Sequence, residues 1–194
     1  SERIVIATCR AHPDYEGKGV RQVAEEEKVD PVDLILRLVA EGDVKAVNHA
    51  MSDDDVRWIM QLPWVATASD GSAMAVRPGN VVHPRNFGTF ARKIGRFAIA
   101  EGELPVEFAI RSASGLPADI LGLDDRGYLR SGYVADVVVF DPQTFRDQAT
   151  FESPQQYATG VRRVFLAGKA AVTDGKPSEE LYGRALRHMP KPAM

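Results

Sequence analysis

The chain has 194 residues, of which 44% are hydrophobic and 26% charged, and its formal net charge is −3. This composition is typical of a globular protein, and the small negative charge argues against a nucleic-acid partner or an anionic membrane surface. No apolar run reaches the ~20 residues that a membrane-spanning helix needs. Cys9 is the only cysteine. An intrachain disulfide is therefore excluded, and we expect a cytoplasmic protein.

The first part of the chain alternates predicted strands with predicted helices. Asp30 followed by Pro31 is a strong helix start, because Asp caps free backbone amides and proline suits the first helical position. Ser52, with Asp55 three residues later, resembles a capping box. The predicted elements are a strand over 4–8, helices over 19–28 and 32–40, a strand over 44–48, a helix from 52 to about 61 and a strand over 64–69. The short links between them predict parallel βα units.

Asp70 is the first candidate catalytic residue. It follows the predicted strand over 64–69, and Gly71 after it permits a sharp turn. In a β/α barrel, catalytic groups lie at the C-terminal ends of strands. Ser-Asp-Gly is also a common turn sequence. Asp70 is therefore either a turn residue or a carboxylate that takes a proton from a metal-bound water.

A long loop over 72–86 carries His83 and Arg85. Loops of this length are usually functional. The planar guanidinium of Arg85 is suited to hold a substrate carboxylate with two hydrogen bonds. His83 is either an ordinary loop histidine or a second substrate-binding group beside Arg85.

The second part of the chain changes from helices to short strands. Five aromatic residues are expected in the core: Trp58, Trp64, Phe87, Phe90 and Phe97. Predicted helices cover 87–101, 105–114 and 117–121, and predicted strands cover 128–130, 135–140 and a hairpin of 161–166 with 170–172. We therefore expect an α/β domain over 1–122 and a β unit over 123–194.

Metal ligands are not apparent. The four histidines are His12, His49, His83 and His188, and no two of them are two to four residues apart. The common zinc-binding spacings are therefore missing. His12 and His49 are each expected in a structural role, although they would still bind a metal if the fold brought them together. We expect no metal site within the chain.

An ordered series of motifs resembles the N-acyl-D-amino-acid deacylase (D-aminoacylase) family of the amidohydrolase superfamily. The resemblance covers nearly the whole chain. Its motifs are Trp64-Val65 leading to Ser69-Asp70-Gly71, His83-Pro84-Arg85, Phe87-Gly88-Thr89-Phe90 with Arg92, Pro117-Ala118, Leu121-Gly122-Leu123, Asp125-Arg126-Gly127, the run from Ala135 to Pro142, and Ala149-Thr150-Phe151-Glu152.

This resemblance implies a zinc-dependent β/α-barrel hydrolase with a β-sandwich appendage, acting on N-acyl-D-amino acids. Asp70 would be the general base and then pass a proton to the leaving amine. Arg85, with His83, would bind the substrate, with Arg85 on its α-carboxylate. Residues from about 12 to 51 would form a helical insertion that covers the active site.

The chain is expected to be only the C-terminal portion of such an enzyme. A complete barrel takes about 250 residues, and the family's metal ligands lie upstream of any residue present here. We expect the remaining N-terminal part as a partner, with zinc in the full-length enzyme but neither zinc nor turnover for this chain alone. The main alternative is a non-catalytic, self-associating binding or structural module. A dipeptidase-like or hydantoinase-like amidohydrolase is a third interpretation, and the Gly88-Thr89-Phe90 segment after His83-Pro84-Arg85 argues against it. Exposed strand edges and apolar helix faces favour homo-oligomers.

Overall fold

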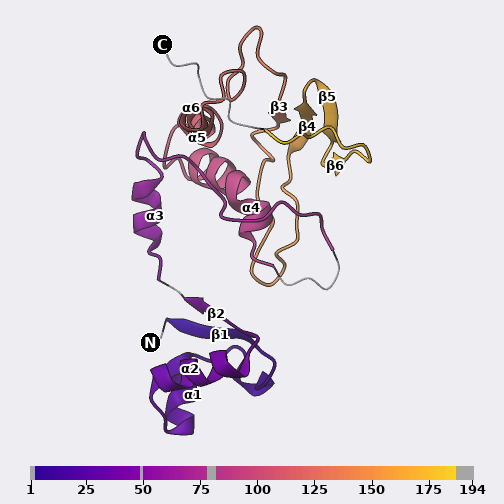
Figure 1. The fold of residues 1–194 in the computed structure, drawn as a ribbon. Coiled ribbons are helices and arrows are strands. Elements are labelled where there is room, and N and C mark those ends of the chain that lie inside the picture. Colours follow the sequence, from indigo (N-terminus) through magenta and orange to yellow (C-terminus); the bar gives the residue numbers. More distant parts are fainter. Residues whose placement is uncertain (1–2, 49, 78–81, 187–194) are drawn as a thin grey trace, which may run out of the picture. The chain divides into compact units, whose positions relative to one another are not determined.

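The computed structural model describes residues 3–48, 50–77 and 82–186 (Figure 1). It divides into two compact units, Ser1–Val56 and Arg57–Met194, and each is described by itself. None of the helices within the described ranges is both long and apolar enough to span a bilayer. The expected division into an α/β domain over 1–122 and a β unit over 123–194 stays a prediction.

The first unit is a two-stranded sheet packed on two helices. Strand β1 (Ile4–Cys9) pairs antiparallel with β2 (Val44–Asn48). Between them lie the short η1 (Pro13–Tyr15) and helices α1 (Val20–Glu27) and α2 (Pro31–Glu41). The expected parallel pairing is wrong for these strands. A single helix after β1 would return the chain to the end of the sheet where β1 begins, so that β2 would run parallel to β1. Two successive helices return it to the end where β1 finishes, so β2 runs antiparallel.

Helix α2 begins where the sequence predicts. The backbone N–H of Val32 donates to Asp30 Oδ1 at 2.7 Å, and the helix ends at Gly42, whose φ is 86°. These caps orient α2 so that its inner face packs on α1 and the sheet. The core of the unit consists of Ile6, Cys9, Tyr15, Val20, Val23, Ala24, Leu34 and Leu38. Cys9 is therefore a buried core residue.

The segment after helix α3 (Asp53–Ile59) is irregular, so the expected strand over 64–69 is wrong. Its backbone bonds to a helix rather than to another strand: the N–H of Thr67 donates to the Ser112 carbonyl at 2.8 Å. Three of the expected core aromatics are also exposed, Trp58 by 65%, Trp64 by 68% and Phe90 by 44%. The core prediction is wrong for these three residues.

Helices form the centre of the second unit. Helix α4 (Arg85–Ala91) continues directly into the π-helical stretch η2 (Arg92–Ala100), followed by α5 (Val106–Ala113) and α6 (Gly115–Leu121). The three helices predicted from the sequence are confirmed, with shifted ends. The residues around Phe145 cross the α4–η2 run so closely that glycine is required at position 95.

A four-stranded antiparallel sheet in the order β3-β4-β5-β6 completes this unit. Its strands are β3 (Val137–Phe140), β4 (Val161–Leu166), β5 (Lys169–Thr173) and β6 (Lys176–Pro177). The predicted hairpin of β4 with β5 is confirmed, whereas the predicted strand over 128–130 is wrong. A closed barrel and a second sandwich layer are not among the described residues and stay predictions.

Candidate active site

Asp70 lies in a tight turn on the second unit. Its φ of 50° places it in the left-handed region, and its side chain is 87% exposed. Asn86 holds the turn, because its Oδ1 accepts a hydrogen bond from the Ser72 N–H at 2.7 Å. A Cβ at position 71 would lie 3.0 Å from the Asn86 Cα, so the turn needs the glycine that is present. The backbone therefore presents the Asp70 carboxylate outward from a fixed turn.

Arg85 reaches the same point from the first residue of α4. Its Nη1 lies 2.9 Å from Asp70 Oδ2, and its side chain is 44% exposed. An ion pair this accessible to water contributes less than about 1 kcal/mol to stability. Both groups can therefore change partners at little cost, which suits a binding site better than a structural bridge.

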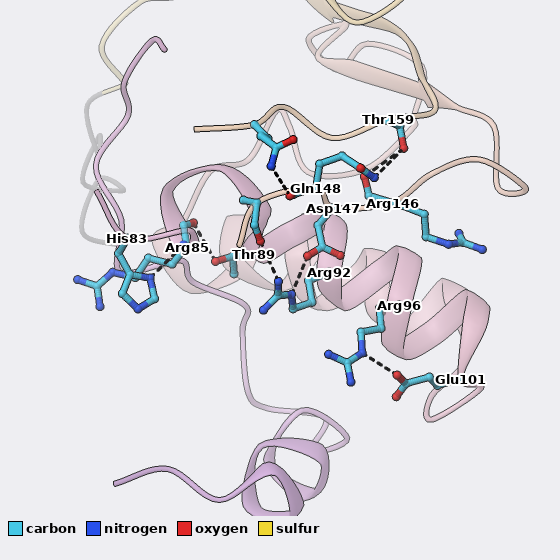
Figure 2. A network of polar contacts seen from close by, with 12 residues as sticks. His83, Arg85, Thr89, Arg92, Arg96, Glu101, Arg146, Asp147, Gln148 and Thr159 are labelled. Atoms are coloured by element: carbon cyan, nitrogen blue, oxygen red, sulfur yellow. Dashed lines mark hydrogen bonds and ion pairs between the residues drawn. The ribbon is translucent and has the colours of Figure 1, made fainter. Parts of the chain in front are cut away.

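His83 completes the cluster. Its Nδ1 accepts a hydrogen bond from the Arg85 backbone N–H at 3.1 Å, so the neutral ring carries its proton on Nε2 (Figure 2). The ring meets Phe151 edge-on at a centroid distance of 5.1 Å. Partial burial, then the positive charges of Arg85 and Arg92, lower the pKa of His83, while Asp70 opposes the shift. This shift favours the neutral form of the His83 ring, in which Nε2–H is a donor.

A segment over 147–157 packs beside this cluster. Figure 2 shows Arg92 directed at Asp147, with Arg92 Nε 2.7 Å from Asp147 Oδ2, and Arg92 Nη2 donates to the Ala149 carbonyl at 3.1 Å. Gln155 holds the loop on the other side, accepting from the Arg77 N–H and donating to its carbonyl at 2.7 and 2.8 Å. The signal for this segment in the sequence was the Ala149-Thr150-Phe151-Glu152 motif.

The described residues do not collect a metal site. No group of three or more His, Cys, Asp or Glu side chains in residues 3–48, 50–77 and 82–186 is arranged to hold a metal ion. His12 is engaged by Glu41 at 3.0 Å and stacks on Tyr15. The question whether His49 meets His12 lies outside the described residues.

Comparison with known proteins identifies the family. Residues 7–172 match the family model described as "Amidohydrolase family". The chain belongs to the amidohydrolase family. Within the family it is similar to the D-aminoacylase of Alcaligenes xylosoxydans xylosoxydans, with 37% identity over 95% of this chain and 37% of that protein. The N-acyl-D-glutamate deacylase of the same organism is 36% identical over 95% of this chain and 36% of its own length.

Solved amidohydrolase structures agree. A crystal structure of D-aminoacylase matches 92% of this chain and 36% of that chain, with a TM-score of 0.76 and 33% identity. The N-acyl-D-glutamate deacylase of Bordetella bronchiseptica, solved with zinc and a phosphonate inhibitor, gives a TM-score of 0.71 and 32% identity over 94% of this chain and 38% of that chain. The present chain thus spans little more than a third of the length of these relatives.

Proposed function

We propose that this chain is the C-terminal portion of a zinc-dependent hydrolase that removes the acyl group from N-acyl-D-amino acids. The observation that carries the proposal is the convergence of Asp70, His83 and Arg85 at the start of α4. A carboxylate, a neutral imidazole N–H and a guanidinium at one exposed point form a set suited to an amide that bears a free carboxylate.

Asp70 and Arg85 act in sequence in this proposal. The α-carboxylate of the substrate replaces Asp70 on the Arg85 guanidinium, where two parallel hydrogen bonds are available. Asp70, released from the ion pair, accepts a proton from the water that attacks the amide carbonyl and then delivers it to the leaving amine. Substrate binding and the freeing of the base are thus one event.

His83 supports the same binding step. With Nδ1 occupied by the Arg85 N–H, the ring fixes the backbone from which the guanidinium extends. Its Nε2–H remains available as a neutral donor to the carbonyl or carboxylate oxygen of the substrate. A lowered pKa keeps this donor uncharged near neutral pH.

The relatives favour the shared chemistry over any one side chain. Proteins named D-aminoacylase, N-acyl-D-glutamate deacylase and N-acyl-D-aspartate deacylase match this chain at 37%, 36% and 32% identity. These names differ in the amino acid and share the acyl group and the D configuration. We therefore assign the described cluster to the features that all such substrates have, the amide and the α-carboxylate.

Zinc is proposed as a cofactor of the intact enzyme. A solved relative contains zinc, and another study of D-aminoacylase concerns its binuclear metal center. Because the donors described here do not form such a site, the ligands would lie elsewhere in the intact polypeptide. That the chain binds no zinc by itself stays a prediction.

The carboxylate role of Arg85 is tested by comparing two substrates in the intact polypeptide. For the unaltered protein, we expect N-acetyl-D-leucine to exceed N-acetyl-D-leucinamide in kcat/KM by about 10²-fold or more, since a charged hydrogen-bonded contact is worth roughly 2–3 kcal/mol. Arg85→Ala should remove most of this preference, whereas Arg163→Ala, which removes an arginine of β4 paired with Asp174, should keep it. An unchanged preference in Arg85→Ala would contradict the assignment.

A further inference from the structure

Lys93 is a buried cationic side chain that the proposed chemistry does not use. It is the second residue of the π-helical stretch η2 and is only 7% exposed. Its Nζ donates to Thr67 Oγ1 at 2.9 Å, and no carboxylate in the described ranges pairs with it. Burial lowers the pKa of its amine. Burying an amine costs free energy unless the amine is hydrogen-bonded.

The hydrogen bonds at Lys93 form a series in which each donor points away from the Lys93 amine. The Ser112 hydroxyl, 1% exposed, donates to the Ala109 carbonyl at 2.9 Å. Its oxygen, 3.3 Å from Thr67 Oγ1, is therefore the acceptor for the Thr67 hydroxyl. Thr67 Oγ1 in turn accepts from Lys93, so each hydroxyl both donates and accepts. The Thr67 N–H adds a backbone bond to the Ser112 carbonyl at 2.8 Å.

This series of hydrogen bonds fixes the segment that leads to Asp70. Thr67 lies three residues before Asp70 in an irregular stretch without strand pairing. A further hydrogen bond between this part of the chain and α5 runs from Arg111 Nη1 to the Pro63 carbonyl and is longer, at 3.4 Å. Thr67 is thus the point at which both backbone and side chain join the helices, and Lys93 supplies the bond from η2.

We propose that Lys93 is a positioning residue: through Thr67 it holds the Asp70 turn in the geometry that proton transfer requires. The proposal rests on the proposed function of Asp70. Without the amine, Thr67 Oγ1 loses its donor on the η2 side, and the segment before Asp70 keeps its attachment to α5 while Asn86 still holds the residues after it. A displacement of about 1 Å in a catalytic group lowers turnover by up to about 10²-fold.

The test is a double-mutant cycle in the intact polypeptide, with kcat and KM measured on N-acetyl-D-leucine. We expect Lys93→Met and Thr67→Val each to lower kcat by roughly 10- to 100-fold with KM nearly unchanged. The double variant should lose no more than Thr67→Val alone, because Thr67→Val already removes the bond that Lys93→Met removes. Thr67→Ser, which keeps the hydroxyl, should restore most of kcat, and Lys169→Met, an exposed lysine of β5, is the matched control.

Amide hydrogen exchange gives a readout that does not depend on the reaction. The amide of residue 67, which donates to the Ser112 carbonyl, should exchange at least about tenfold faster in Lys93→Met and Thr67→Val, with protection in β4 and β5 unchanged. If Lys93→Met does not fold, Lys93→Gln, which keeps a donor, and Thr67→Val carry the test. Losses of kcat that multiply in the double variant, or unchanged exchange of the residue 67 amide, would overturn the proposal. Retained activity in Asp70→Asn would refute the proposed function instead, while the exchange result still decides the Lys93–Thr67 link.

Discussion

The close crossing at Gly95 gives the sharpest stability prediction. A Cβ at this position would overlap the carbonyl oxygen of Phe145 and lie 3.2 Å from its carbonyl carbon. Both obstacles are backbone atoms, so neither can rotate away, and the α4–η2 run must shift against the segment that starts at Phe145. Overpacking of this kind costs about 1–3 kcal/mol. Because the obstacle is rigid, we take the upper end.

Gly95→Ala also removes a helical glycine, which stabilises by about 1 kcal/mol. The net expectation is a loss of about 2 kcal/mol in the free energy of unfolding. For a chain of this length the loss corresponds to a Tm lower by about 4–8 °C. Urea denaturation followed by circular dichroism measures it, with an unchanged m-value as evidence that only the native state is affected.

Gly88→Ala is the matched control, since position 88 is in the same helical run. There the new Cβ would make ordinary contacts of 3.5 Å with the side chains of Ala149 and Asp147. Only the gain from replacing a helical glycine by alanine remains, and we expect Gly88→Ala to raise the free energy of unfolding by about 0.5–1 kcal/mol. Equal effects of the two substitutions, or a stable Gly95→Ala, would refute the close approach of Phe145 to the helix.

Three further predictions test other parts of the chain. Asp30→Ala should destabilise the first unit by about 1 kcal/mol through loss of the α2 cap, whereas Asp30→Ser should keep most of it; urea denaturation decides, and equal losses would contradict the cap. Ala167 has a φ of 50° in the β4–β5 turn, so Ala167→Asn should stabilise by about 0.5–1 kcal/mol in thermal unfolding, and no gain would refute the strain. His83 should titrate by NMR below its ordinary pKa, so its stability penalty is absent above pH ~6.5 and grows as pH falls towards the folded pKa. Asp70→Asn should lower the pKa of His83 further and Arg85→Ala should raise it, because Asp70 and Arg85 act on this pKa in opposite directions. A His83 pKa that is the same in both variants as in the unaltered protein would show that His83 is not close to these two residues.

Features coded within a few residues were predictable from the sequence. The α2 start depends on Asp30 and Pro31 alone, and the β4–β5 hairpin on apolar runs around a glycine turn. Strand pairing was not predictable in the same way. The apolar run over 64–69 has a strand-like composition, but its backbone partner in the described residues is the end of α5, a contact 45 residues away in sequence. A strand needs a neighbour that local composition does not specify.

The candidate site was predictable in part for the same reason. Asp70, His83 and Arg85 were identified by motif, and they lie together at the start of α4. The position of the segment over 147–157 beside the site was not predicted. This segment follows α6 in the chain, and it reaches the site through the contacts of Arg92 and Gln155. Lys93 gave no signal at all, because a lysine between polar and apolar neighbours usually lies on the surface. Its burial follows from the packing of η2 against Thr67 and Ser112.

The central claim is that Asp70 transfers the proton in amide hydrolysis, and turnover of N-acetyl-D-leucine by Asp70→Asn in the intact polypeptide tests it most directly. Since the Asp70 side chain is 87% exposed, the substitution should leave the unfolding transition within about 0.5 kcal/mol of the unaltered protein. We expect kcat to fall by about 10²- to 10⁴-fold, the contribution of a positioned general base. An Asp70→Asn protein that keeps its kcat within a few fold would contradict it.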